Sequence, residues 1–564
     1  MSKEQGSESA VSRSQSIKEE EMAEEKEAPR KVSRRGFVKG AAAVAGAGAL
    51  ASCAPAATPA PTTAPEATAT TAPAAAPTPA PEKWDYETDI VVAGSGNGGL
   101  SAAIAAAEEG AKVIVVEVSS TTGGGSAYSG GFIHCVGIGT YDDYLKWTDG
   151  MHDPVLGRVY FENWVKYSSW LGEIDAYVSP PYQSYDRMMG KGEPWPERCR
   201  LYFDSLERIF EEAGGTLLLN TAATKILTGD EGEVLGLRAK GPEGMLDIKA
   251  KAVILATGGF QGNSEFRQKF YGPYGDLASV YGVPYHTGAG MVMAQEVGAS
   301  LSDCMAHFAA VSSPAHPFGH FHEDAEEYEK RPYTVAGKGE LANLFFVVPR
   351  EHIYVNLAGE RFVDEGERSY RIEQGIMRQF EAKAFSIFDD AIWSKRKDEL
   401  TWTGVSTAKD TLDTCVRWGA TLVTADTMDE FANKLAELRV HKANFLKTIE
   451  EYNAALDAGT TAELQVARTG QLADVETPVP QAGDLVKIET PPFYAFPVTP
   501  WVYSCAGGVA INKDAQVLDI DKRPIAGLYA VPPTAGGIMR EVYTGGIATA
   551  GTFGWIAGKH AAGL

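Results

Sequence analysis

The feature that most constrains this chain lies between Asp89 and Glu117. It reads DIVVAGSGNGGLSAAIAAAEEGAKVIVVE: an apolar run, a glycine turn, an alanine-rich stretch, and a second apolar run that ends in an acid. This order is typical of a βαβ unit that binds a dinucleotide, with the pyrophosphate at the helix N-terminus. A glycine motif alone would be weak support, but strand, helix and terminal acid together favour binding over an ordinary turn.

Each residue type in this unit suits a phosphate held against backbone N–H groups. Gly94 is expected to permit the tight turn, Gly96 to let the chain approach the phosphates, and Gly99 to let the helix pack on its strand. Glu117, about 23 residues beyond Gly94, is placed to accept hydrogen bonds from a ribose diol. The predicted ligand contacts here are Gly94, Ser95, Gly96, Asn97, Gly98, Gly99 and Glu117.

Three further glycine-rich segments are candidates for the same site. Residues 121–131 are too glycine-rich for regular structure and supply backbone and hydroxyl donors that can lie against a flat ligand. A strand-like run, 252–255, leads into a second turn, 256–260, and a C-terminal turn, 545–548, predicts a helix whose N-terminus faces the ligand. The contacts predicted from these segments are Gly124, Gly125, Ser126, Ser129, Gly130, Gly131, Ala256, Thr257, Gly258, Gly546 and Ile547.

Length and composition indicate a globular body of two domains behind a non-globular leader. The chain is 44% hydrophobic and 22% charged, which is typical of a globular protein, and its 564 residues are too many for a single hydrophobic core. Residues 84–283 and 485–564 share strands and glycine turns, which predicts one discontinuous dinucleotide-binding domain of the α/β class. Residues 284–484 carry more charge and helical runs at 428–438 and 441–456, which predicts an inserted α+β capping domain. Helical periodicity is also expected over 141–178.

The leader carries a predicted export signal. The run SRRGFVK at 33–39 is followed by a weakly apolar stretch and then Leu50-Ala51-Ser52-Cys53. Residues 1–53 are therefore predicted to be a twin-arginine signal ending in a lipoprotein cleavage box, with Cys53 lipidated. The alternative is a basic patch in a disordered tail. Residues 54–83, rich in Pro, Ala and Thr, predict a linker that holds an extracytoplasmic body off the membrane, with the lipid as the only anchor.

Net charge and cysteine spacing limit the partners and metal centres that this chain is expected to have. The formal net charge of -23 argues against a nucleic-acid partner, since neutralising phosphates needs clustered Lys and Arg. The chain has 6 cysteines and no CxxC, so no iron–sulfur cluster, structural zinc site or c-type haem is expected, and electrons must come from an external donor or go to an external acceptor. The loose group His316, His320 and His322 is more typical of a solvated loop than of a metal site.

Eight motifs carry a family resemblance. They are GSGNGGLSAA, GGGSAYSGG, ILATGGF, YHTGAGMVMAQEVGA, VNLAGERFVDE, TADTMDEFA, PPFYAFPV and GLYAVPPTAGGIMREVYTGG. From about Trp84 to Leu564 the chain resembles the fumarate reductase/succinate dehydrogenase flavoprotein superfamily, and within it the branch of 3-ketosteroid dehydrogenases. The resemblance implies FAD as the cofactor, a Rossmann-like FAD-binding domain split around the cap, and chemistry that adds or removes hydrogens across a CH–CH bond beside an activating group.

Departures from the family pattern point to the substrate. Fumarate reductases of the superfamily grip a carboxylate with an arginine in the C-terminal glycine turn and a histidine before an earlier GG pair. The matching positions in this chain are Tyr543 and, approximately, Tyr503 or Ser504. In the ketosteroid dehydrogenases the first position is a tyrosine whose phenol polarises the substrate ketone. The resemblance therefore implies Tyr543 as the electrophile, with Tyr503 and Ser504 toward the substrate.

The resemblance places the proton carrier after GERFVDE, where this chain reads ERSYR. Tyr370 is favoured as acid or base; Arg368 is the alternative carrier, or a cation that lowers the phenol's pKa. The family's acid or amide after GLYA is replaced here by Val531-Pro532-Pro533, so FAD contact in that segment is expected from backbone or from Thr534.

Three functions follow from these patterns. The leading one is an FAD enzyme that desaturates or reduces a carbon–carbon bond alpha,beta to a ketone such as a 3-ketosteroid. The second is an enoate reductase acting on a carboxylic acid, with Arg368 as proton donor. The third is a non-catalytic surface lipoprotein that binds a ligand through the same fold.

Overall fold

The structure, a computed structural model, describes residues 81–564 except 136–138, 182–185, 194–196, 281, 284, 303–306, 313–350, 368, 401–406, 418–419, 470–484 and 541. The predicted signal with Cys53, the linker up to residue 80, and the group His316, His320 and His322 lie outside the described residues. Within the described part, no helix combines the length and apolar character needed to span a bilayer.

The dinucleotide-binding core is a six-stranded sheet with strand order β17-β18-β10-β2-β3-β6. Five strands run parallel: β2 (Ile90–Ala93), β3 (Val113–Val116), β6 (Thr216–Leu218), β10 (Ala252–Leu255) and β18 (Pro524–Ala530). The sixth, β17 (Gln516–Leu518), pairs antiparallel with β18. Strands β2, β3 and β10 are buried along their whole length, as continuous apolar strands of a parallel sheet should be. Because β17 and β18 come from the C-terminal segment, distant parts of the chain build this one sheet.

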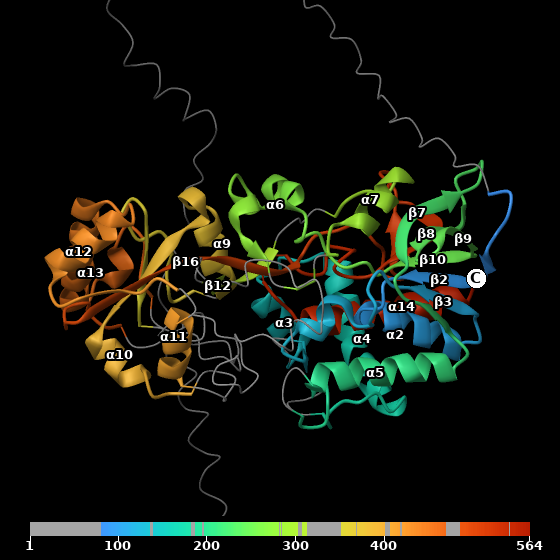
Figure 1. Cartoon of the computed structure of the whole chain (residues 1–564), viewed down its shortest axis with the longest axis horizontal. Helices are drawn as coiled ribbons and strands as arrows, with labels where there is room; N and C mark the ends of the chain where they lie inside the picture. Colours follow the sequence, from blue (N-terminus) through green and yellow to red (C-terminus); the bar gives the residue numbers. More distant parts are fainter. Residues whose placement is uncertain are drawn as a thin grey trace, which may run out of the picture. The chain divides into compact units, whose positions relative to one another are not determined.

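Two helices of small residues lie side by side against this sheet: α2 (Asn97–Glu108) and α14 (Gly546–Ala562) (Figure 1). A methyl group added at Gly554 would come within 2.1 Å of the Gly98 carbonyl oxygen, and one at Gly558 within 2.2 Å of the Ala102 carbonyl oxygen. Glycine at both positions therefore lets the two helix backbones approach closely. This packing carries the last helix of the chain to the first glycine turn.

The stretch 141–178 forms two helices rather than one: α3 (Tyr141–Trp147) and α4 (Pro154–Glu173). The break occurs because Asp153 caps the second helix, accepting from the N–H groups of Val155 and Leu156, and proline opens it. On these helices Trp147, Leu156, Trp164, Trp170 and Leu171 are buried, whereas Phe161 is half-buried. Helix α5 (Glu197–Glu212) packs on the other side of α2.

Several shorter elements accompany the dinucleotide-binding core. A four-stranded sheet has the order β1 (Tyr86–Glu87), β9 (Gly244–Lys249), β8 (Val234–Gly241) and β7 (Ala222–Thr228). A small ribbon pairs β4 (Phe132–Ile133) with β5 (Arg187–Met188), and α6 (Ser264–Tyr271), β11 (Ser279–Val280) and α7 (Ala289–Glu296) follow β10.

The insertion has its own hydrophobic core. Its sheet contains β13 (Ile353–Asn356), β14 (Ala384–Asp389), β15 (Val423–Ala425) and β16 (Phe493–Cys505), with β12 (His307–Ser312) along β16. Its helices are α9 (Ser369–Met377), α10 (Asp390–Arg396), α11 (Ala408–Arg417), α12 (Met428–Glu437) and α13 (Lys442–Ala458). Strand β16 begins in this core, pairing with β14 and β15, and its later residues pair with β11. One long strand thus belongs to both cores.

Candidate functional site

The predicted ligand segments meet at the carboxyl edge of the parallel sheet. The register pairs Ala93 at the end of β2 with Leu255 of β10 and with Val116 of β3. The turns that follow these strands therefore start side by side, and the N–H of Ala256 donates to the Ala93 carbonyl at 2.8 Å. Ligands of open parallel sheets bind outside these carboxyl ends. The structure thus brings together the first glycine turn, the Ala256 turn and Glu117.

The glycines of the first turn have different physical roles. A methyl group at Gly94, whose φ is +105°, would come within 2.3 Å of the Ala256 carbonyl oxygen, and one at Gly99 within 1.9 Å of the Gly94 carbonyl oxygen. At Gly96 the nearest atom would be the Gly123 carbonyl oxygen, at an ordinary 3.7 Å. Packing within the protein therefore requires glycine at 94 and 99 but not at 96. At 96 the close approach of a ligand is what explains the glycine.

Helix α2 begins in a way that fits a dinucleotide. Its first residues, Asn97 to Gly99, are buried, its N-cap residue Gly96 offers no side chain, and the first turn holds no acid. The Asn97 N–H has one long contact, to the Ser126 hydroxyl at 3.5 Å. Buried N–H groups at a helix N-terminus need acceptors, and a pyrophosphate supplies them. Helix α14 starts after Gly545 with the same lack of a side-chain cap. The residues present therefore fit the cofactor.

Glu117 is held by the protein and keeps room for one more donor. Its Oε2 accepts from the Ser95 N–H at 2.8 Å and the Ser95 hydroxyl at 2.6 Å, and its Oε1 accepts from the Ser119 N–H at 2.9 Å. A carboxylate offers roughly four lone-pair positions, so Oε1 can accept a further bond, as from a ribose hydroxyl. The Ser95 side chain thus orients Glu117.

The Asn97 side chain joins helices. Its amide donates to the Tyr167 hydroxyl at 3.0 Å and the Ile547 carbonyl at 2.8 Å, and accepts from the Tyr202 hydroxyl at 2.7 Å. With these bonds made, its backbone is the part left for the cofactor. The Ile547 carbonyl is likewise engaged in tying α14 to α2.

The second glycine segment lies beside the first. A short 3₁₀ helix, η1 (Gly124–Tyr128), follows Gly123, whose N–H donates to the Ser95 carbonyl at 3.1 Å. This contact places Gly124, Gly125 and Ser126 next to the first turn. Farther along, the Ser129 hydroxyl accepts from the Gly131 N–H at 3.1 Å, Gly130 is exposed and Gly131 is buried.

The Ala256 turn and the turn after β18 are tied to each other. The Thr534 hydroxyl donates to the Gly258 carbonyl at 3.0 Å and lies 3.3 Å from the Thr257 hydroxyl. The Thr257 oxygen also accepts from the Gly290 N–H at 3.1 Å, at the start of α7. Both threonine hydroxyls are therefore engaged by protein, which leaves mainly backbone for the cofactor.

Tyr543 lies in a firmly held turn just before α14. Its carbonyl accepts from the Trp147 indole at 2.9 Å, and the next carbonyl, of Thr544, accepts from the Tyr160 hydroxyl at 3.0 Å. The Gly546 N–H, at the start of α14, donates to the Tyr543 phenol oxygen. Helices α3, α4 and α14 together therefore position this side chain.

An aromatic cluster surrounds Tyr543, and we call it the Tyr543 cluster: Tyr543, Tyr503 and His134. The Tyr503 ring lies edge-on at 6.0 Å between centroids and the His134 ring at 6.4 Å. Ser504 follows Tyr503 on β16, where the pairing with β12 shifts register, and its hydroxyl donates to the Cys505 carbonyl at 3.5 Å. The structure thus brings Tyr503 and Tyr543 together, and adds His134, which follows β4 and belongs to no motif.

The Tyr543 cluster is uncharged near neutral pH. Burial raises the pKa of Tyr543 above its ordinary value and lowers the pKa of His134 to about 4. Both residues still keep some accessible surface, as do Tyr503 and Thr257. The described apolar neighbours, Ala506 and Met539, add no charge.

The structure says less about the predicted proton carriers. Arg368 lies outside the described residues, and Tyr370 is placed only as the second residue of α9. Arg371 pairs with Asp149, after α3, at 2.5 Å and with Glu367 at 3.3 Å. It therefore ties the start of α9 to the first domain.

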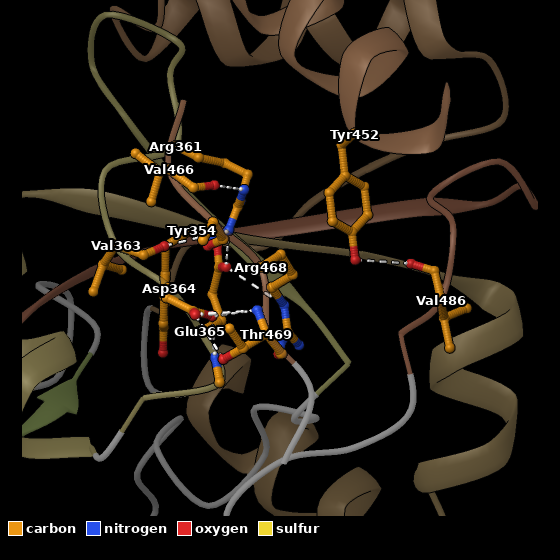
Figure 2. Close-up of polar contacts among 12 residues, drawn as sticks. Tyr354, Arg361, Val363, Asp364, Glu365, Tyr452, Val466, Arg468, Thr469 and Val486 are labelled. Carbon is orange, nitrogen blue, oxygen red and sulfur yellow. Dashed lines mark hydrogen bonds and ion pairs between the residues drawn. The ribbon is translucent and has the colours of Figure 1, made fainter. Parts of the chain in front are cut away.

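A buried ion network holds the GERFVDE turn that precedes α9 (Figure 2). Glu365 accepts from the Arg361 guanidinium at 3.2 and 2.5 Å and from the Tyr354 N–H at 2.8 Å, and it lies 3.5 Å from Arg468 Nε. The neighbouring Asp364 accepts from both the N–H and the hydroxyl of Thr469. The network joins this turn to residues 466–469.

Comparison with known proteins identifies the family. A family described as FAD binding domain matches residues 89–549. The chain belongs to this family. The prediction of FAD as cofactor is confirmed.

Named relatives agree with the predicted superfamily. An NADH:acrylate oxidoreductase of Vibrio harveyi is 28% identical over 64% of this chain and 32% of its own length. A probable fumarate reductase of Shewanella frigidimarina is 30% identical over 64% of this chain and 52% of its own length. A 3-oxosteroid 1-dehydrogenase of Mycolicibacterium smegmatis is 26% identical over 61% of this chain and 59% of its own length. The chain thus spans about a third to somewhat over half of these curated relatives.

Solved structures agree on the fold. The open conformation of a flavocytochrome c3 fumarate reductase matches with a TM-score of 0.58 and 26% identity, covering 85% of this chain and 79% of that one. A 3-ketosteroid Δ1-dehydrogenase from Sterolibacterium denitrificans matches with a TM-score of 0.64 and 21% identity, covering 85% and 99%. The predicted superfamily and fold class are confirmed, and the relatives' names support the prediction of a flavin oxidoreductase.

Proposed function

We propose that this chain is an FAD-dependent oxidoreductase that acts on a carbon–carbon bond alpha,beta to a neutral carbonyl, such as the ketone of a 3-ketosteroid. The observation that carries the proposal is the Tyr543 cluster, where a phenol stands between two other uncharged aromatic rings. A 3-oxosteroid dehydrogenase among the relatives supports the same substrate class. Bound FAD supplies hydride exchange with one carbon of the bond.

Tyr543 would stabilise the charge that develops on the substrate carbonyl. Its oxygen accepts the Gly546 N–H, and accepting one hydrogen bond strengthens the phenol as a donor. Because the phenol is neutral at physiological pH, it favours a neutral carbonyl over a carboxylate, which calls for bidentate arginine. Tyr370 would carry the proton at the neighbouring carbon, with Arg368 as the alternative.

The second candidate is an enoate reductase that acts on a carboxylic acid, with Arg368 as proton donor. The acrylate and fumarate enzymes among the relatives favour it. In that case the carboxylate would be bound by arginines away from the Tyr543 cluster. Either activity requires an external electron donor or acceptor.

The decisive test compares compounds as electron acceptors for the reduced flavin. Reduced protein is mixed anaerobically with an enone steroid, with fumarate and with acrylate, and flavin reoxidation is followed by absorbance. Rapid reoxidation by the steroid supports the ketone proposal, and rapid reoxidation by the acids alone contradicts it.

Tyr543→Phe should lower the rate by about 100-fold if the phenol is an oxyanion donor. Tyr452→Phe is the matched control, since it removes a phenol that donates to the Val486 carbonyl at 3.2 Å in the cap core. An equal loss in both variants would contradict the role of Tyr543.

We also propose export by the twin-arginine route and lipid anchoring at Cys53. The support is the arginine pair at 34–35 in register with the cleavage box. Replacing both arginines by lysine should retain the protein in the cytoplasm, and Cys53→Ser should release it from the membrane fraction.

A further inference from the structure

His286 lies between two of the glycine turns, although it belongs to none of the predicted contacts. A methyl group at Gly125 would come within 2.3 Å of His286 Cε1, and one at Gly258 within 2.4 Å of Cδ2. The Nε2 atom is close to both positions, at 3.1 and 2.5 Å. Glycine at 125 and 258 therefore makes room for this imidazole, and its Nε2 edge points between the two turns.

Gln261 determines which imidazole nitrogen carries the hydrogen. The Gln261 Nε2 lies 2.6 Å from His286 Nδ1 and also donates to the Tyr503 carbonyl at 3.3 Å. A carbonyl can only accept, so the atom facing it is the amide nitrogen, which in turn can only donate to Nδ1. The hydrogen of the neutral ring is therefore on Nε2.

The amide of Gln261 is itself held on every side. Its Oε1 accepts from the Cys505 thiol at 3.2 Å, and its backbone carbonyl accepts from Arg267 at 2.6 Å. The Gly262 N–H donates to the His286 carbonyl at 2.7 Å. Gln261 is almost completely buried, so this arrangement is rigid and the imidazole is oriented before any ligand arrives.

The Nε2–H is left as an open donor. Among the described residues, the hydrogen bond to Gln261 is the one that the His286 side chain makes, and the ring keeps some accessible surface. Burial lowers the pKa of His286 to about 4, so the ring stays neutral and keeps this single donor at physiological pH.

The position of this donor favours the redox-active ring of the cofactor over its phosphates. The pyrophosphate belongs at the N-terminus of α2. His286, in contrast, is linked through Gln261 to the carbonyl of Tyr503, whose ring packs on Tyr543. The ring system that exchanges electrons with the substrate must lie beside that cluster.

We propose that His286 donates a hydrogen bond from Nε2 to the isoalloxazine of FAD, and that Gln261 holds it in place to do so. A donor at the ring raises the midpoint potential, because reduction adds negative charge to the ring heteroatoms. This inference rests on FAD binding and is independent of which substrate the enzyme takes.

The test uses His286→Phe, which keeps a ring at this position but removes the donor. The control is His560→Phe. His560 lies near the C-terminal end of α14, and its imidazole is hydrogen-bonded to Tyr529 of β18. The FAD dissociation constant and the midpoint potential are measured without substrate. His286→Phe should weaken FAD binding by about 2- to 12-fold and lower the potential, since one hydrogen bond is worth about 0.5–1.5 kcal/mol. The control should change neither.

A second variant keeps the test decisive if His286→Phe does not fold. Gln261→Met leaves the imidazole but releases Nδ1, so it should shift the potential in the same direction by a smaller amount. Wild-type potential and affinity in either folded variant would overturn the proposal. A wild-type protein that binds FAD but reduces no enone would instead contradict the proposed substrate and leave this inference standing.

Discussion

Removing the charge of Glu365 should destabilise the cap strongly. The Glu365 and Arg468 side chains are 0% exposed and the Arg361 side chain is 6% exposed. Two guanidinium groups thus share one buried carboxylate (Figure 2). In Glu365→Gln the side chain keeps its size and one acceptor for the Tyr354 N–H, but both arginines lose their buried counter-charge.

The magnitude follows from the cost of an uncompensated buried charge. Breaking a buried pair by removing one partner costs about 3–5 kcal/mol. Because glutamine retains an acceptor oxygen, we expect the lower end, about 3 kcal/mol, which corresponds to more than a hundredfold in the folding equilibrium. An exposed pair behaves differently: Lys409–Asp413 on α11, with side chains 54% and 59% exposed, should contribute little because water screens both charges.

Urea unfolding of the FAD-loaded protein measures this difference. Because the cap has its own core, tryptophan fluorescence, which includes Trp393 in that core, should show an earlier transition in Glu365→Gln, while flavin release should shift less. Asp413→Asn is the matched control, since it neutralises one carboxylate in the same domain. If Glu365→Gln and Asp413→Asn unfold within about 0.5 kcal/mol of each other, the network does not stabilise the cap as argued.

Two further outcomes follow from the first domain. Gly99→Ala should abolish FAD loading, measured as the ratio of flavin to protein absorbance, because its methyl group would lie 1.9 Å from the Gly94 carbonyl oxygen. Gly563→Ala is the control, since its methyl group would lie at an ordinary 3.4 Å from the His560 carbonyl oxygen. The stability of the protein should fall as pH drops from about 6.5 to about 4, because His134 and His286 stay neutral down to a pKa of about 4 while the unfolded chain takes up protons near the ordinary value of 6.5. Thermal unfolding across this range should show a shallower slope when either histidine is replaced by glutamine, and an unchanged slope would contradict the low pKa values.

Residues whose role depends on backbone geometry could be predicted from the sequence. Gly94 and Gly99 are needed where a strand turns into a helix, and the spacing alone indicates both. Asn97 and Thr534 were expected at the cofactor, yet their side chains tie helices and turns that lie far apart in the chain. Local patterns do not show such partners, so a polar residue inside a motif can be structural.

His286 shows the opposite case, because its importance comes wholly from distant residues. Gly125 comes from the segment after β3, whereas Gly258 and the imidazole's partner Gln261 follow β10, and no spacing rule connects either segment with His286.

The cofactor side of the site uses mainly backbone groups and the proposed substrate side uses side chains, and this difference explains why only the second can select a substrate. The cofactor side consists of strand ends, glycine turns and two helices whose N-cap residues are glycines, so backbone N–H groups provide most of its donors. Such donors suit phosphates and a flat ring. In the proposed substrate site, by contrast, the side chains of Tyr543, Tyr503 and His134 come from three separate elements, and the Gly546 N–H donates to the Tyr543 phenol. The positive end of α14 would then act through a neutral hydroxyl, which suits a carbonyl oxygen that gains charge only during the reaction.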